Sequence, residues 1–180
     1  WNALDRHVEA GHGDRLALVY DSPVTGTAAS FTYTELLDAV ARFAGVLRDL
    51  GVEKGDRVLV YMPMVPEAVV AMLATARLGA VHSVVFGGFA PHELAIRIDD
   101  ATPKVVVSAS CGIEPGRVVE YKPMLDKALE QAEHKPSATV ILQRPQAVAE
   151  MGANDHDWAE LAATADPAGC VMVDATDPLY

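Results

Sequence analysis

The sequence predicts an α/β fold in which βαβ units form a mostly parallel sheet flanked by helices. Between residues 58 and 108, short valine-rich apolar runs alternate with longer segments of helical periodicity. The connections between them are short, which is typical of βαβ units. In addition, two glycines, Gly87 and Gly88, follow one of the apolar runs directly. Ligands of parallel sheets bind at the loops after the carboxyl ends of the strands, so this loop is the first place to look for function.

The central stretch should contain three strands joined by two helices. The expected strands are residues 58–61, 81–85 and 104–108, and the expected helices are residues 66–78 and 91–100. Pro66 suits the first helical position, and Gly79 ends the same helix. This helix has almost no polar face, so we expect other elements to cover it on all sides.

The segment before this stretch predicts a short helix at residues 2–9 and then a β-hairpin. The hairpin strands are expected at residues 16–20 and 30–33, on either side of a run of turn-forming residues. Thr32 and Glu35 have the spacing of a capping box, which predicts a helix that begins there and continues to residue 50.

The segment after the central stretch is less regular. Residues 111–117 are too rich in glycine and proline for either regular state, which predicts a loop at the carboxyl end of a strand. The remaining expectations are a helix at 122–134, a strand at 139–142, a short helix at 157–163 and a last strand at 170–173. No linker or repeat divides the chain, so residues 1–180 should form a single α/β unit.

Composition limits the classes of partner. The chain carries 25 acidic and 14 basic residues, a formal charge of −11, which argues against binding nucleic acid or an acidic membrane. An anionic ligand must therefore be held locally, by backbone N–H groups and a few placed cations. Two cysteines without zinc-site spacing favour reduced thiols in a cytosol-like compartment. We find no signal peptide or membrane-spanning run, and because the chain starts at Trp1 we expect the native N-terminus to be missing.

Two loops contain residues that could bind a nucleotide. The Phe86-Gly87-Gly88-Phe89 loop could offer backbone N–H groups to a phosphate and the face of Phe86 to an adenine, or it could be an ordinary turn with both phenylalanines in the core. Arg117 should lie at the same end of the sheet, where it could grip a phosphate or remain a solvated surface arginine. Arg97 and Lys122 are weaker candidates and should lie on solvated helix faces.

Other motifs give no site. The third glycine of the dinucleotide fingerprint is absent after Gly88. Thr25-Gly26-Thr27 lies between two expected strands, whereas a phosphate loop needs a strand before it and a helix after it. We find no metal-ligand spacing around the histidines, no serine in a nucleophile elbow and no carboxylate pair forced together by spacing, so no catalytic residue is assigned.

With residues 82–91, HSVVFGGFAP, the chain resembles the AMP-forming short-chain acyl-CoA synthetases, the acetyl- and propionyl-CoA synthetase group of the adenylate-forming superfamily. Stretches along the whole chain agree: residues 5–9, 31–37, 55–58, 61–67, 97–100 and 116–117. Residues 111–117 and 120–123 are most similar to the propionate-type branch.

The resemblance implies a two-step ligation. A short-chain carboxylate, propionate or acetate, reacts with ATP and Mg²⁺ to give an acyl-adenylate, and the thiol of CoA then displaces AMP. It also implies that the phosphate loop, the ATP and Mg²⁺ sites and the C-terminal domain follow residue 180. We therefore expect residues 1–180 to be the incomplete N-terminal part of the large adenylation domain, inactive alone, in the cytoplasm or in a mitochondrial matrix.

The resemblance further implies a CoA site. In the family, the stretch matching Phe86, Gly87 and Gly88 packs against the CoA adenine, and the loop matching Glu114, Pro115, Gly116 and Arg117 contacts its ribose and phosphates. Acetate-type enzymes carry an arginine where Glu114 stands, so Arg117 is the cation that remains here. The alternative is a free-standing, non-catalytic α/β module that binds a nucleotide or a protein through the same loops.

Overall fold

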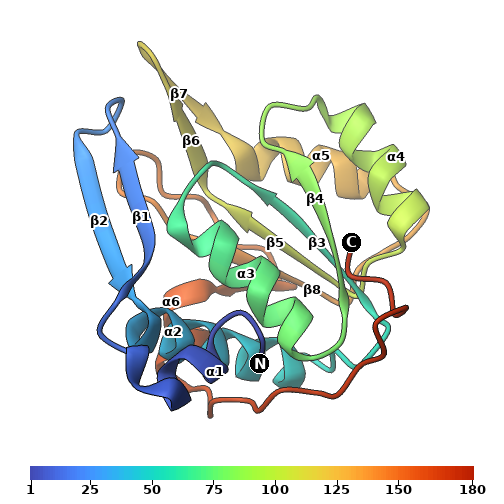
Figure 1. The fold of residues 1–180 in the computed structure, drawn as a ribbon. Helices are drawn as coiled ribbons and strands as arrows, with labels where there is room; N and C mark the ends of the chain where they lie inside the picture. Colours follow the sequence, from blue (N-terminus) through green and yellow to red (C-terminus); the bar gives the residue numbers. More distant parts are fainter.

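The computed structural model describes residues 1–180 and has a parallel sheet of five strands in the order β4-β3-β5-β8-β9 (Figure 1). The strands are β3 (Arg57–Met62), β4 (Val81–Phe86), β5 (Val105–Ala109), β8 (Ala138–Leu142) and β9 (Asp155–Asp157). The helices around them are α2 (Tyr33–Asp49), α3 (Pro66–Arg77), α4 (Pro91–Ala101), α5 (Tyr121–Gln131) and α6 (Trp158–Thr164). The βαβ units expected from periodicity are confirmed.

The core has two layers, one on each face of the sheet. Val58 and Val60 of β3 pack with α2, α3 and α6, whereas Leu59 and Tyr61 pack with α4 and α5. This division follows from strand geometry, because successive side chains of a strand point to opposite faces. Both faces are apolar, which is why these strands read as continuous hydrophobic runs in the sequence.

The N-terminal segment confirms the hairpin and the cap. It contains α1 (Asp5–His7), the π-helical turn η1 (Val8–His12), β1 (Leu16–Ser22) and β2 (Thr27–Thr32), with the two strands antiparallel. The backbone N–H of Glu35 donates to Thr32 Oγ1 at 3.2 Å, and the N–H of Thr32 donates to Glu35 Oε2 at 2.8 Å. This reciprocal pair is the capping box that starts α2.

The expectation of an irregular loop at residues 111–117 is wrong. Residues Cys111–Glu114 form β6 and Arg117–Glu120 form β7, an antiparallel pair that projects from the end of the sheet. Gly116 has a φ of 79°, in the left-handed region that glycine enters without strain. Pro115 and Gly116 are thus confined to a two-residue turn, and the flanking residues are free to pair as strands.

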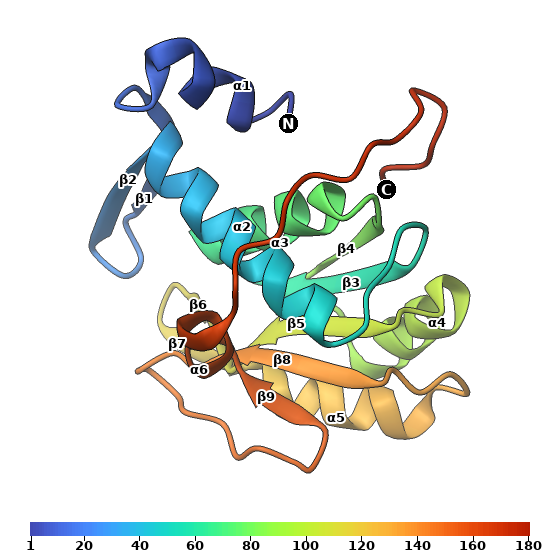
Figure 2. The same ribbon diagram turned by 90° about the horizontal axis from the view of Figure 1, so that it is seen from below.

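The last strand expected at residues 170–173 does not form. Figure 2 shows the C-terminal tail crossing α2 and running along α3 instead of joining the sheet. Its backbone is held by α2 and α3: the N–H of Ala168 donates to Ala41 O, and the N–H of Val171 donates to Arg77 O. Residues 170–173 pair with no strand, so their high β-propensity is not used. The tail meets β4 only further on, where the Leu179 carbonyl accepts from the His82 N–H at 3.1 Å.

Helix α3 is covered as its apolar sequence predicts, because none of its residues is exposed. Its last residue, Arg77, donates to both carboxylate oxygens of Asp5 at 2.7 and 2.8 Å, and its Nε donates to Ala168 O at 2.7 Å. The two ends of the chain therefore meet on this helix. No helix of the structure combines the length and the apolar character that crossing a membrane requires.

Candidate functional site

The loop after β4 exposes one aromatic ring. The Phe86 side chain is 74% exposed, so the interpretation of Phe86 as a core residue is wrong. Phe89 does pack partly against the core on the α4 and α5 face, and its carbonyl accepts a hydrogen bond from the Tyr61 hydroxyl at 3.2 Å. The ring of Phe86 meets that of Phe89 edge to face at 6.1 Å. Most of the Phe86 ring is therefore accessible from solvent.

The two glycines of this loop differ in their surroundings. Gly88 is exposed, but its N–H donates to the Phe86 carbonyl at 2.8 Å and closes the turn. Gly87 is buried against the side chain of Tyr121. The loop therefore offers a ring and a close approach to its backbone rather than a set of free N–H groups.

The β6–β7 hairpin holds the other candidate residues. Arg117 donates to Glu114 Oε2 from Nε at 2.7 Å and pairs with it through Nη2 at 2.6 Å. The side chain of Arg117 is 69% exposed and that of Glu114 is 44% exposed, so Arg117 is a surface residue with a partner. Pro115 and Gly116 form the turn between them.

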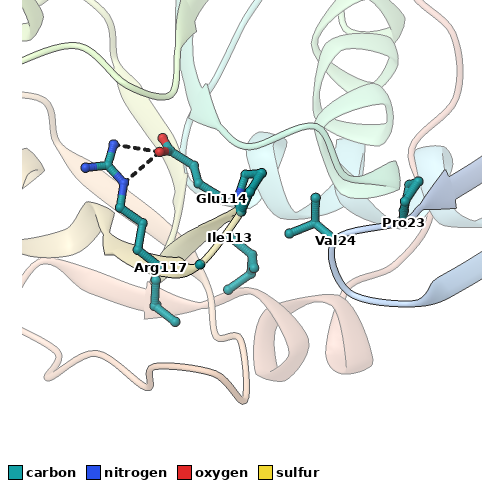
Figure 3. Close-up of a pocket in the computed structure, with 8 residues that line it drawn as sticks. Pro23, Val24, Ile113, Glu114 and Arg117 are labelled. Atoms are coloured by element: carbon teal, nitrogen blue, oxygen red, sulfur yellow. Dashed lines mark hydrogen bonds and ion pairs between the residues drawn. The ribbon is translucent and has the colours of Figure 1, made fainter.

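A groove of ≈590 Å³ separates this hairpin from the turn of the β1–β2 hairpin. It is lined by Pro23 and Val24 on one side and by Ile113 to Val118 on the other (Figure 3). The paired head groups of Glu114 and Arg117 point away from Val24. The groove thus has apolar walls with a charge pair on its outer side. Phe86, Gly87 and Gly88 do not line it.

The sheet brings both loops to one end. Strands β4 and β5 are parallel and separated only by β3, and the loop after β4 and the β6–β7 hairpin after β5 follow their carboxyl ends. The convergence expected for Phe86 and Arg117 is therefore confirmed at the level of the sheet. The residue that joins the two loops, Tyr121, was not singled out from the sequence, because a tyrosine that begins an amphipathic helix carries no distinctive signal.

Lys122 was expected on a solvated helix face, and this expectation is wrong. Its side chain is 6% exposed and pairs with Asp126 at 2.5 Å and with Asp155, itself 7% exposed, at 2.8 Å. Burial acts to lower the pKa of Lys122, but its hydrogen bonds to both carboxylates outweigh burial and raise the pKa. This lysine is therefore a charged structural group that connects α5 to β9. Arg97, the other weak candidate, stacks over the ring of Phe89 at 5.1 Å.

Comparisons with known proteins agree with this architecture. The family model described as AMP-binding enzyme matches residues 4–180. The chain is 54% identical over its whole length to the mitochondrial acyl-CoA synthetase short-chain family member 3 of Rattus norvegicus, covering 27% of that protein. It is 47% identical to an acetyl-coenzyme A synthetase of Streptomyces avermitilis over 91% of the chain and 25% of the relative. A crystal structure of an acyl-CoA synthetase from Brucella canis superimposes with a TM-score of 0.79 and 26% identity, over 97% of this chain and 29% of that one.

The chain thus spans between a quarter and three tenths of the length of these relatives. The match nevertheless extends over nearly every residue of the chain itself, in sequence and in fold. The chain belongs to the family of AMP-binding enzymes, and the resemblance to short-chain acyl-CoA synthetases is confirmed.

Proposed function

We propose that the chain is the N-terminal part of the adenylation domain of an acid–CoA ligase. In the first step, a propionate or acetate oxygen attacks the α-phosphate of ATP and releases pyrophosphate. In the second step, the CoA thiol attacks the acyl-adenylate carbonyl and releases AMP. The similarity to short-chain acyl-CoA synthetases over the whole chain is the observation that carries this proposal.

We assign this chain no part in the chemistry itself. No group of three His, Cys, Asp or Glu side chains is placed to hold a metal ion, so no Mg²⁺ ligand is assigned here. ATP, Mg²⁺ and the carboxylate would be bound by residues that this sequence does not contain, and the 180 residues alone should not form acyl-adenylate. The protein would act in the cytoplasm, or in the matrix if it is mitochondrial like the rat relative.

The contribution of this chain would be a part of the CoA site. Phe86 would stack on the adenine, Gly87 and Gly88 would let it approach the backbone, and Arg117 would bind a phosphate beside Glu114, Pro115 and Gly116. Three observations support this assignment: the ring of Phe86 is exposed, Arg117 lies on the surface, and both follow the carboxyl ends of parallel strands, β4 and β5, that are separated only by β3. An aromatic ring can stack on any base, provided that the base can reach the face of the ring.

The test uses Phe86→Ala and Arg117→Ala in the complete protein. The lost stacking should cost about 1–3 kcal/mol of CoA binding, and the lost charged hydrogen bond about 1.5–3 kcal/mol. Either change should raise the KM for CoA by roughly tenfold or more, while pyrophosphate exchange measured without CoA stays close to wild type. That split separates a CoA contact from a loss of stability, which would depress both half-reactions.

Arg42→Ala is the matched control, because Arg42 makes the same kind of exposed pair with Asp38 on α2, at 2.9 Å. It should leave the KM for CoA unchanged. If Phe86→Ala and Arg117→Ala also leave it unchanged, the CoA assignment fails and the non-catalytic binding module becomes the better interpretation of these loops.

A further inference from the structure

Tyr121 lies between the two loops of the proposed CoA site. It is the first residue of α5 and is 6% exposed, and its N–H donates to the Ser110 carbonyl at 3.0 Å, next to the end of β5. This bond anchors the start of the helix at the carboxyl end of the sheet. The side chain is consequently buried at the place where the loop after β4 and the β6–β7 hairpin both begin.

The ring of Tyr121 touches one glycine of each loop, and on opposite edges. A methyl group on Gly87 would lie 2.7 Å from Cε2 of Tyr121, and a methyl group on Gly112 would lie 2.7 Å from Cε1. The hydroxyl oxygen would be as close or closer in both cases. Real Cβ atoms essentially never approach other atoms so closely, so a side chain at either position would force the loop or the ring to shift. Both positions therefore need a glycine if the two loops are to pack against the Tyr121 ring.

A second tyrosine connects this ring to the far end of the Phe86–Phe89 loop. Tyr61 of β3 stacks on Tyr121 with centroids 5.0 Å apart, and its hydroxyl donates to Phe89 O. Burial raises the pKa of Tyr61 to about 12 and also raises that of Tyr121, so both phenols are neutral at physiological pH. The contact between the two tyrosine rings is therefore a packing contact and not an ionic one. Close-packed rigid rings transmit a displacement from one to the other.

We propose that Tyr121 is a positioning residue whose ring sets the separation between the Phe86–Phe89 loop and the β6–β7 hairpin. That separation determines how far apart the adenine contact at Phe86 and the phosphate contact at Arg117 lie. The inference rests on the proposed function for the identity of the ligand, but not for the coupling of the two loops. Moving either loop moves the other through the same ring.

Hydrogen–deuterium exchange in the complete protein without ligand tests the coupling. Gly87→Ala, in the loop after β4, should raise amide exchange within the distant residues 111–120 by roughly fivefold or more, as expected when a packed segment opens locally. Gly169→Ala is the matched control, because no atom lies within 4 Å of the added methyl group and the backbone is unstrained. In the double variant Gly87→Ala/Tyr121→Phe the nearest clashing atom, the hydroxyl oxygen, is gone, whereas Cε2 remains 2.7 Å from the added methyl group. Exchange of the hairpin should therefore be slower than with Gly87→Ala alone, but still faster than in wild type.

Unchanged exchange of residues 111–120 in Gly87→Ala would overturn the proposal, as would a double variant no slower than the single one. If Gly87→Ala does not fold, Gly112→Ala provides the reciprocal test, with residues 86–89 as the reporter. If Phe86→Ala and Arg117→Ala leave the KM for CoA unchanged, the proposed function is wrong, but the coupling between the two loops is not affected by that result. If the two substitutions raise the KM for CoA but the exchange data show no coupling between the loops, only the positioning role of Tyr121 is wrong.

Discussion

Glu114 Oε2 accepts a hydrogen bond from Arg117 Nε at 2.7 Å across the turn of the β6–β7 hairpin and forms an ion pair with Nη2 of the same arginine at 2.6 Å. An exposed pair of this kind contributes only about 0.2–1 kcal/mol to stability, so it is easily opened by a ligand. It nevertheless places a carboxylate against the one basic side chain among residues 111–120. An anionic ligand at Arg117 must therefore displace or tolerate a negative charge.

Glu114→Gln should strengthen CoA binding. A carboxylate about 4 Å from a phosphate charge in water costs roughly 1 kcal/mol, so the KM for CoA should fall by about fivefold. If that charge is the 3′-phosphate, the preference for CoA over dephospho-CoA should rise by the same factor. Glu120→Gln removes an equal charge at the base of the hairpin and should change the KM less. A KM that rises in Glu114→Gln would mean that the carboxylate itself holds the ligand.

The buried Lys122–Asp155 pair should matter to stability far more than the Lys122–Asp126 pair. Asp155→Asn leaves a buried lysine short of one counter-charge and should cost roughly 3 kcal/mol in the free energy of unfolding, because breaking a buried pair is strongly destabilising. Asp126 is 47% exposed, so Asp126→Asn should cost less than about 1 kcal/mol. Urea unfolding of the two variants measures this difference. Equal losses would show that the burial of Asp155 is not what makes its pair strong.

The Lys122–Asp155 pair should also make the stability of the protein sensitive to acid. Burial acts to raise the pKa of Asp155, but hydrogen bonds from Lys122, Thr139 and Gly152 outweigh it and lower the pKa. A depressed folded-state pKa means that the stability is present above the unfolded value of about 3.9 and is lost as pH falls through the folded value. Wild type should therefore lose more stability than Asp155→Asn below about pH 4. Parallel pH profiles for the two proteins would contradict this.

His82 should make the protein less stable in mild acid. The imidazole is buried, its Nδ1 has no hydrogen-bond partner, and burial lowers its pKa. The unfolded chain then binds the proton more readily, so stability is complete above about pH 6.5 and declines as pH falls from there toward the folded pKa. Denaturant unfolding at several pH values should show this slope in wild type and a shallower one in His82→Leu. His92→Gln, an exposed histidine on α4, should retain the wild-type slope.

Strand β4 is at the edge of the sheet and should drive association of the 180-residue chain. Its His82 N–H is occupied by the Leu179 carbonyl at 3.1 Å, but further along the strand Val84 is 53% exposed beside the open ring of Phe86. Exposed apolar strand edges pair with other chains, and a lysine on such an edge opposes this. Val84→Lys should lower the light-scattering mass at high concentration, whereas Val148→Lys, at a still more exposed valine outside any strand, should not. A compact monomer in wild type would contradict the prediction.

Local signals in the sequence determined the central βαβ units, the N-terminal hairpin and the capping box of Thr32 and Glu35. Each depends on residues within a few positions of one another. The signals are the change in hydrophobic period between strand and helix, the proline at the start of a helix, and the side-chain oxygen of Thr32 three residues before the N–H of Glu35. The position of the candidate loops also followed, because the parallel order of β4 and β5 sends both carboxyl ends to one edge.

Only the tertiary structure decided which residues fill the space between those elements. The valines of the tail have the propensity of a strand but lie against α3. Strand β9 has no β-forming residues, yet its residues Asp155–Asp157 pair with β8, and Asp155 accepts a hydrogen bond from the Thr139 hydroxyl. Lys122 is buried because two carboxylates reach it, one of them 33 positions away in the sequence. The Tyr121 ring likewise lies between Gly87 and Gly112, a contact among residues that are not close to one another in the sequence. Contacts between distant residues depend on how the layers pack, and no local pattern of the chain encodes that packing.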